Sequence, residues 1–204
     1  MTADSMNAPD FLDATDPFKL LAAWYAEAER AEPRDPNACQ VATVDSAGLP
    51  NIRTVLVKDQ GTEGFVFYTN TASAKGAELI ASPKAALLYY WKTLSRQIRV
   101  RGDVGTVSEA EADVYFATRA RDAQIGAWAS LQSQVMPSRV EFERRFAEIS
   151  DRFANSPVPR PAHWSGFRLV PSYIEFWQER PFRLHDRLAF ARQGNGWRRC
   201  QLYP

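Results

Sequence analysis

Two arginines, a histidine and an aspartate lie within five positions of one another near the C-terminal end of the chain. Arg183, His185, Asp186 and Arg187 follow an apolar stretch that carries Trp177. As a surface loop this cluster would be unremarkable. Beside a cavity, a fixed guanidinium and an imidazole could orient an aromatic, phosphorylated ligand. This segment is the most specific chemical pattern in the sequence.

Two segments further upstream combine cations with small polar groups, which suits them to hold an anion. Arg53 and Lys58 lie at the two ends of an apolar run, and in a strand their different parity would turn them to opposite faces. Tyr68 and Thr69 end another apolar run and are followed by Lys75 near the start of a short helix, an arrangement that could grip a phosphate. Taken singly, each segment also fits an ordinary surface with charges at the ends of strands.

Gln97, Tyr115 and Arg119 are three more candidates. Gln97 interrupts an apolar strand pattern, and a buried amide needs partners that either a flavin's pyrimidine edge or backbone groups could supply. Tyr115, Arg119 and Ala123 are spaced four residues apart. If one helix runs through all three positions, a phenol and a guanidinium share one face and can reach the same phosphate. A helix surface with a half-buried tyrosine is the alternative interpretation.

The composition is that of an ordinary globular chain and argues against several functional classes. Of the 204 residues, 45% are apolar and 24% are charged, and the formal charge of +1 argues against a dedicated nucleic-acid binder. No apolar run is long enough to span a bilayer and no secretion signal is recognisable, so we expect a cytoplasmic protein. Cys39 and Cys200 are expected to be free, buried thiols, with a disulfide as the open alternative. His163 and His185 are too few for a histidine-rich metal site, so no metal is expected.

The motifs of the common nucleotide-binding and hydrolytic folds are absent from the sequence. There is no G-x-G-x-x-G, no G-x-x-x-x-G-K-[ST], no G-x-S-x-G, no H-E-x-x-H and no C-x-x-C. A nucleotide-like cofactor would therefore be held by side chains and scattered backbone amides.

Hydrophobic periodicity predicts helices that flank a set of short antiparallel strands. Capping and proline signals place helices over 17–30, 73–81, 108–118 and 138–154. Strand patterns cover 40–45, 52–58, 65–69, 85–91, 97–101, 103–107, 166–169, 174–177, 188–191 and 197–202. Short connections between strands favour an α+β, mainly antiparallel barrel with helices at its flank. Residues 1–15 are expected to be a flexible N-terminus and 16–204 a single domain.

Together, in this order and spacing, these segments resemble the pyridoxine/pyridoxamine 5′-phosphate oxidase family. The resemblance runs from about residue 36 to the C-terminus. It is carried by R-T-V-L-V-K (53–58), V-F-Y-T-N (66–70), W-K-T-L-S-R-Q-I-R-V-R-G (91–102), R-D-A-Q-I-G-A-W-A-S-L-Q-S (121–133), and I-E-F-W-Q (174–178) followed by R-L-H-D-R (183–187). It implies an FMN-binding split β-barrel that works as a homodimer with two FMN sites at the subunit interface. The segment 164–204 would complete the barrel and the dimer interface.

The resemblance also assigns ligand-binding residues position by position. The implied FMN contacts are Arg53, Thr54, Val55, Leu56, Val57, Lys58, Tyr68, Thr69, Lys75, Gln97, Gln132, Ser133, Trp177 and Arg187. The implied substrate contacts are Lys58, Tyr115, Arg119, Arg183, Leu184 and His185. Of these, Lys58, Tyr115 and Arg119 would face the substrate phosphate. Arg183 and His185 would lie over the substrate ring as the catalytic pair.

The reaction implied by the resemblance is oxidation of pyridoxine or pyridoxamine 5′-phosphate by dioxygen, with FMN as cofactor. It yields pyridoxal 5′-phosphate and hydrogen peroxide, a step of vitamin B6 biosynthesis and salvage. Two alternatives stay open: a related flavin oxidase of secondary metabolism, of the phenazine type, and a non-catalytic flavin-binding or pyridoxal-phosphate-binding protein. The preference between the two substrates is also open.

Two positions depart from the pattern of the family. Ala74 stands where many relatives carry an arginine before the lysine that binds the FMN phosphate, and Ala123 stands where they carry a serine that binds the substrate phosphate. A lost hydrogen bond to a charged group is worth roughly 1.5–3 kcal/mol. We therefore expect intact chemistry with looser binding of FMN or substrate than in relatives.

Overall fold

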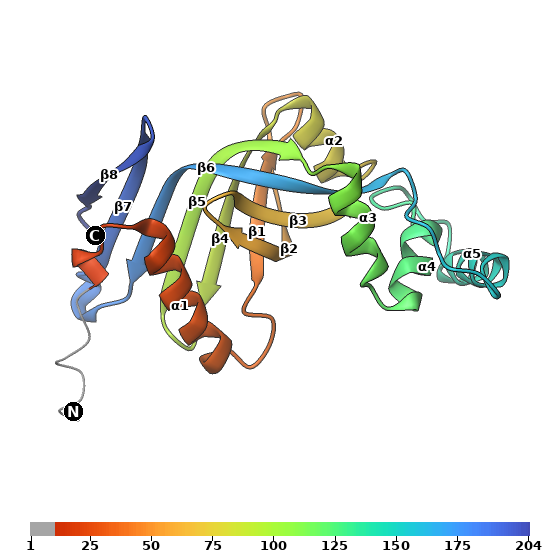
Figure 1. The fold of residues 1–204 in the computed structure, drawn as a ribbon, viewed down its shortest axis with the longest axis horizontal. Helices are drawn as coiled ribbons and strands as arrows, with labels where there is room; N and C mark the ends of the chain where they lie inside the picture. Colours follow the sequence, from red (N-terminus) through yellow and green to blue (C-terminus); the bar gives the residue numbers. More distant parts are fainter. Residues whose placement is uncertain (1–10) are drawn as a thin grey trace.

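Six antiparallel strands form a closed barrel in the computed structural model, which describes residues 11–204 (Figure 1). The barrel closes because β3 pairs with both β2 and β6, and β7 and β8 extend the sheet beyond β6. The barrel strands are β1 (Ala38–Val44), β2 (Pro50–Gly61), β3 (Gly64–Asn70), β4 (Lys84–Trp91), β5 (Arg96–Thr106) and β6 (Trp164–Gln178). The additional strands are β7 (Asp186–Gln193) and β8 (Gly196–Gln201). This confirms the predicted α+β, mainly antiparallel barrel.

Helices lie around the barrel, and the C-terminal hairpin and the later helices occupy opposite ends of the molecule (Figure 1). The helices are α1 (Pro17–Ala31), α2 (Ala74–Ala81), α3 (Glu109–Ala117), α4 (Arg121–Ala129) and α5 (Arg139–Arg152). β7 and β8 lie at one end, and α4 and α5 lie at the other. No helix within residues 11–204 is long and apolar enough to cross a membrane.

Side chains that cap helices explain why the predicted helix starts are correct. Asp16 accepts hydrogen bonds from the backbone amides of Phe18 and Lys19, at 2.9 and 3.2 Å, at the start of α1. Serines do the same at the starts of α2, α3 and α5; they are Ser73, Ser108 and Ser138. Each bond satisfies a backbone N–H that has no partner within the helix. One face of α1 then buries Trp24, whose ring packs edge-on against Phe176 of β6.

The region 108–129 is two helices, so the condition under which Tyr115, Arg119 and Ala123 would share one helix face is not met, whereas the predicted end of the first helix near residue 118 is confirmed. α3 ends at Ala117, and α4, which the sequence did not predict, begins at Arg121. The Gln124 side chain donates to the carbonyl of Phe116, 3.0 Å away, and so satisfies the end of α3. Because the Phe116 carbonyl finds a partner outside the helix, α3 can end without a glycine or proline.

Three further details differ from the expectations. Residues 1–10 of the predicted mobile segment lie outside the described residues, but Phe11–Asp13 forms a short 3-10 helix, and Phe11 packs on Trp24 with ring centroids 5.0 Å apart. Cys39 and Cys200 are free as expected, although Cys200 is exposed in this chain. The strands predicted at 97–101 and 103–107 are one strand, β5, and those at 166–169 and 174–177 are one strand, β6.

A bulge between β5 and β6 explains the interrupted strand pattern. Arg101 pairs with Tyr173 and Gly102 pairs with Pro171, so Ser172 is the extra residue. Ser172 Oγ donates to the carbonyl of Arg101 at 3.2 Å. Proline lacks a backbone N–H, and a bulge is one of the few places where a sheet accepts it. A Cβ at Gly102 would lie far inside van der Waals contact with the carbonyl oxygen of Val170.

Gly102→Ala is therefore expected to lower the free energy of unfolding by about 1–3 kcal/mol, because the backbone of β6 must shift. Gly105→Ala in the same strand is the matched control, since nothing lies within 4 Å of the added Cβ. The control should be neutral or slightly stabilising. Urea unfolding at one protein concentration measures both. Equal midpoints for the two variants would contradict the close approach at Gly102.

Candidate functional site

Lys75 is a buried ammonium that is surrounded by neutral acceptors. Its side chain lies in α2, and the residue is only 9% exposed. The Nζ atom lies 3.0 Å from Thr69 Oγ1, 3.4 Å from Ser73 Oγ and 3.1 Å from Gln132 Oε1. Burial lowers the pKa of Lys75, and the nearby Arg53 lowers it further against the opposing effect of Glu78. An anion at this position would offset the cost of burying the charge.

Arg119 is a second cation with free hydrogen-bonding capacity. Its Nη1 atom is fully buried and has no hydrogen-bond partner among the described residues. The guanidinium carbon lies 4.8 Å from the ring centroid of Trp164 and 5.5 Å from that of Phe116. Burial lowers the pKa of Arg119, and Tyr115 partly opposes this. A buried polar atom without a partner requires an explanation, and an anionic ligand supplies one.

Lys75 and Arg119 line the same cavity, which has a volume of about 400 Å³. Its lining residues are Thr54, Val55, Leu56, Lys58, Tyr68, Thr69, Lys75, Tyr115, Arg119, Gln132 and Trp164. Every one of them except Trp164 was among the residues named from the sequence. The break after α3 therefore does not separate Tyr115 from Arg119, and both reach the cavity. Ser133, which has a left-handed backbone with φ of 71°, follows directly after Gln132.

Arg53 is not among the residues that line this cavity, because its guanidinium is engaged by a carboxylate and a hydroxyl. Arg53 Nη2 lies 3.0 Å from Glu78 Oε2, and Nη1 donates to Thr43 Oγ1. Burial alone would raise the pKa of Glu78, but hydrogen bonds from Thr43, Asn51 and Arg53 hold it below its usual value. Val57 is buried in the barrel core, so only its backbone can face a ligand. The anionic partner of Arg53 within this chain is thus a carboxylate.

A second group of named residues forms one row across three neighbouring strands. Gln97 of β5 pairs with Trp177 of β6, which in turn pairs with Arg187 of β7. Together with Arg99, Glu175 and Pro204 they surround a cavity of about 250 Å³. The row presents an amide, an indole and a guanidinium, which suits a planar ligand with a polar edge.

Glu175 fixes the position of Arg187. Glu175 Oε1 accepts from Nε and Nη2 of Arg187 at 2.9 and 2.7 Å, and Oε2 accepts from Arg99 and from the Tyr173 hydroxyl. Burial alone would raise the pKa of Glu175, but these hydrogen bonds hold it below its usual value. Arg187 Nη1 also donates to the carbonyl of Tyr203 at 2.9 Å. One carboxylate oxygen thus accepts two N–H groups of the same guanidinium and holds it in place, and Arg187 in turn ties down the C-terminus through the carbonyl of Tyr203.

Arg183, Leu184 and His185 lie in the exposed turn between β6 and β7. The His185 ring lies 4.6 Å from the Trp177 ring, and His185 Nδ1 accepts a hydrogen bond from the backbone N–H of Arg180 at 3.2 Å. Phe182 and Arg183 both have positive φ, at 59° and 64°. Such backbone conformations are strained in residues other than glycine and cluster at functional sites.

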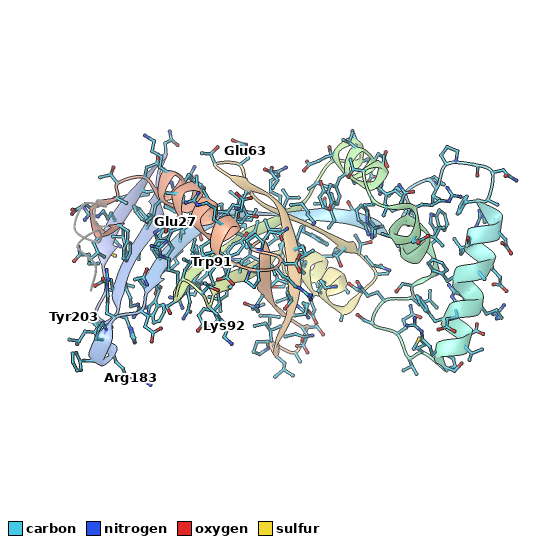
Figure 2. All side chains as sticks on the ribbon, turned by 90° about the horizontal axis from the view of Figure 1, so that it is seen from below. Glu27, Glu63, Trp91, Lys92, Arg183 and Tyr203 are labelled. Atoms are coloured by element: carbon cyan, nitrogen blue, oxygen red, sulfur yellow. The ribbon has the colours of Figure 1, made fainter. Side chains whose placement is uncertain are left out.

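The two groups lie far apart within one chain. Figure 2 shows Arg183 and Tyr203 at one end of the molecule, whereas α4 and α5 lie at the other end (Figure 1). Trp164 and Trp177 mark the two groups on the same strand, and thirteen residues of extended chain span up to roughly 40 Å. The structure therefore gathers most of the predicted site residues into two separate groups.

Reasoning from the sequence missed Arg99, Glu175 and Pro204 at the smaller cavity, and Trp164 at the larger one. Trp164 carries no charge, and it begins β6 directly after a proline-rich connector, where the pattern predicts only a strand starting at residue 166. The two departures, Ala74 and Ala123, lie at the start of α2 and within α4. Their expected effect on affinity stays a prediction.

Two family models match the chain. Residues 25–153 match a model described as pyridoxamine 5′-phosphate oxidase, and residues 164–204 match one described as the pyridoxine 5′-phosphate oxidase C-terminal dimerisation region. The second match contains Trp177, Arg183, His185 and Arg187.

Among curated proteins, a pyridoxine/pyridoxamine 5′-phosphate oxidase from Caulobacter vibrioides is 58% identical over 96% of this chain and 88% of its own length. One of the same name from Rhodopseudomonas palustris is 56% identical over 98% of this chain and 95% of its own. A crystal structure of PhzG from Burkholderia lata 383, in complex with tetrahydrophenazine-1-carboxylic acid, is 32% identical, with a TM-score of 0.90 and 98% of each chain covered. A structure of a pyridoxamine 5′-phosphate oxidase-related, FMN binding protein from Nostoc punctiforme shares the fold, with a TM-score of 0.74, 19% identity, and coverage of 94% of this chain and 100% of its own.

Glu175→Gln tests the carboxylate that holds Arg187. Because the pKa of Glu175 is depressed in the folded protein, its stabilisation is present above the unfolded pKa of about 4.3 and is lost as the pH falls through the folded value. We expect Glu175→Gln to lower the free energy of unfolding by about 2 kcal/mol at pH 7, since charged hydrogen bonds are broken. The difference in the free energy of unfolding between this variant and the wild type should become smaller below about pH 4.

Urea unfolding over a pH series measures this difference. Glu143→Gln is the control, since the exposed pair of Glu143 with Arg139 is expected to contribute nothing measurable. A gap between Glu175→Gln and wild type that stays constant down to pH 3 would contradict the assignment.

Proposed function

The chain belongs to the pyridoxamine 5′-phosphate oxidase family, and we propose that it oxidises pyridoxine 5′-phosphate or pyridoxamine 5′-phosphate with bound FMN and dioxygen. The products are pyridoxal 5′-phosphate and hydrogen peroxide, with ammonia released from the amine substrate. The observation that carries this proposal is the pair of cations Lys75 and Arg119 in one cavity. Both have hydrogen-bond donors that suit phosphate groups, and neither forms an ion pair within the described residues.

The residues present fit FMN. Lys75 lies buried among Thr69, Ser73 and Gln132 without a carboxylate partner, which suits the cofactor phosphate. Gln97, Trp177 and Arg187 form a row that suits the edge and face of a flavin ring. When bound, FMN supplies the acceptor for the two electrons of the substrate, which then pass to dioxygen. We extend the cofactor assignment to the remaining residues implied by the family pattern.

The chain's own residues bind and orient the substrate. Lys58, Tyr115 and Arg119 line one wall of the larger cavity and would hold the substrate phosphate. Arg183 and His185 would fix the substrate ring: Arg183 lies in a turn with strained backbone, and the His185 ring packs against Trp177 beside the second group. Holding both ends of the substrate places its reacting carbon reproducibly. In such enzymes this positioning is the main task of the protein.

A homodimer would unite the two groups of residues, which would then be the two half-sites of one active site. Within one chain the row of Gln97, Trp177 and Arg187 lies far from the cavity of Lys75 and Arg119. The match of residues 164–204 to a dimerisation region supports an interface that carries the second half-site. A two-fold axis that places one half-site of each subunit against the other half-site of its partner creates two equal sites.

A phenazine-type oxidase is the alternative that an observation favours, because PhzG has the same fold at 32% identity. Curated relatives named pyridoxine/pyridoxamine 5′-phosphate oxidase are more similar, at 52–58% identity. A non-catalytic flavin-binding or pyridoxal-phosphate-binding protein is the third possibility.

One assay distinguishes these functions. The protein is incubated with FMN and dioxygen, and with either pyridoxine 5′-phosphate, pyridoxamine 5′-phosphate or a tetrahydrophenazine carboxylic acid. We expect pyridoxal 5′-phosphate absorbance and peroxide from the first two substrates only. Turnover of the tetrahydrophenazine carboxylic acid alone would show that the chain is a phenazine-type oxidase. No turnover of any of the three compounds would show that it is a non-catalytic binding protein. Arg183→Ala should lose most of the activity and keep FMN.

Mixed dimers test the shared site. Arg119→Ala and Arg183→Ala remove groups from different half-sites, so each variant alone should be nearly inactive. Co-expressed with two different tags and purified through both, the mixed dimer should regain activity, because one of its two sites keeps both residues. Mixed dimers as inactive as either parent would show that the two residues belong to the same chain's site. Wild-type dimers carrying the same two tags are the control.

A further inference from the structure

We propose that Trp164 is a positioning residue that holds the Arg119 guanidinium by its aromatic face and thereby leaves the N–H groups of Arg119 free for the substrate phosphate. The proposal rests on the proposed function, in that it takes the anion at Arg119 to be the phosphate of the substrate. Trp164 touches the cavity but has no charge and no place in the family pattern described above.

Arg119 is held differently from Arg53, Arg160 and Arg187. Arg53 is held by Glu78, Arg187 by Glu175, and Arg160 by Glu109 and Asp113. In each of these pairs, N–H groups in the plane of the guanidinium are occupied by a carboxylate. Such arginines have less capacity left for an anion that arrives later.

The guanidinium of Arg119 instead rests on aromatic rings. Its central carbon lies 4.8 Å from the Trp164 centroid and 5.5 Å from the Phe116 centroid, and Nη1 is buried without a partner among the described residues. A cation–π contact uses the flat face of the guanidinium, whereas its hydrogen-bond donors point outward in the plane. Aromatic support therefore fixes the position of the cation without occupying its donors.

Trp164 is itself held rigidly. It is 6% exposed, and as the first residue of β6 it pairs with Asn70 of β3. Its carbonyl accepts a hydrogen bond from Arg160 Nη1 at 2.7 Å. Its ring lies nearly parallel to the rings of Tyr68 and Tyr115, with centroids 5.3 and 6.2 Å away.

This aromatic layer joins two elements of the site. Tyr68 and Tyr115 stack with centroids 4.0 Å apart, so β3, α3 and the start of β6 meet in one set of parallel rings. Tyr115 lies four residues before Arg119, and the loop between α3 and α4 places the Arg119 guanidinium over the Trp164 ring of this layer. Without the indole, the loop would keep the charge near the cavity but would not fix its direction.

Trp164→Leu and Trp164→Phe test the proposal in the FMN-loaded enzyme. The measured quantities are KM and kcat for pyridoxine 5′-phosphate, the inhibition constant of inorganic phosphate, and the Kd of FMN. For Trp164→Leu we expect KM and the phosphate inhibition constant to rise about tenfold, which matches the loss of a desolvated cation–π contact. The kcat and the Kd of FMN should change less than twofold. Phenylalanine keeps a weaker aromatic face, so Trp164→Phe should cause a rise of about twofold to threefold.

Trp197→Leu is the matched control. Trp197 supports Arg192 in a similar contact, 5.4 Å from the guanidinium carbon, on the hairpin of β7 and β8. This variant should leave the phosphate inhibition constant unchanged. If Trp164→Leu does not fold, Trp164→Phe alone carries the test, with the same expected direction.

A double-mutant cycle distinguishes positioning from a general disturbance of the cavity. In an Arg119→Ala background, Trp164→Leu should cause no further loss of phosphate affinity, because its effect acts through Arg119. Calorimetric titration with inorganic phosphate measures the phosphate affinity without turnover. The result is therefore valid even if the protein oxidises neither pyridoxine 5′-phosphate nor pyridoxamine 5′-phosphate. An equal loss in both backgrounds, or an unchanged phosphate affinity in Trp164→Leu and Trp164→Phe, would overturn the proposal.

Discussion

The pairing of β6 with both β3 and β5 is the constraint on which the rest of the molecule depends. This one strand closes the barrel and then continues to carry β7 and β8. The first half of β6 pairs with β3 and its second half pairs with β7. Trp164 is therefore held at one cavity and Trp177 at the other. A continuous strand cannot fold back on itself, so the element that stabilises the barrel also keeps the half-sites apart. A site that combines both groups, as proposed above, would therefore need a second copy of the chain.

The cations of this chain are held in two different ways. Arg53, Arg160 and Arg187 each meet a carboxylate, which fixes the guanidinium even where, as proposed for Arg53 and Arg187, it also contacts a ligand. Lys75 and Arg119 meet neutral oxygens or aromatic rings, at the cost of burying charge that is not neutralised. Such an arrangement is unfavourable for folding alone, and it is favourable once an anion is bound. The electrostatic cost is therefore itself a sign of function.

Much of the local structure could be read from the sequence, because the interactions that decide it span only a few residues. Ser73, Ser108 and Ser138 cap their helices through bonds to an amide three residues onward, so the pattern in the sequence and the bond in the structure coincide. Lys58 lines the larger cavity and Arg53 does not, in keeping with the different parity of the two positions in the strand. The resemblance to a family extended the prediction to most of the side chains that line the two cavities.

Contacts between distant segments were decided only by the tertiary structure. Three such contacts depend on strand register and packing. They are the hydrogen bond from Gln124 to the end of α3, the bulge at Ser172 opposite Gly102, and the contact of Arg119 with the Trp164 ring. The sequence by itself determined which residue types are present and on which face of each element they lie. Whether a buried cation meets a carboxylate, a neutral oxygen or an aromatic ring was decided by the fold, because that partner comes from elsewhere in the chain.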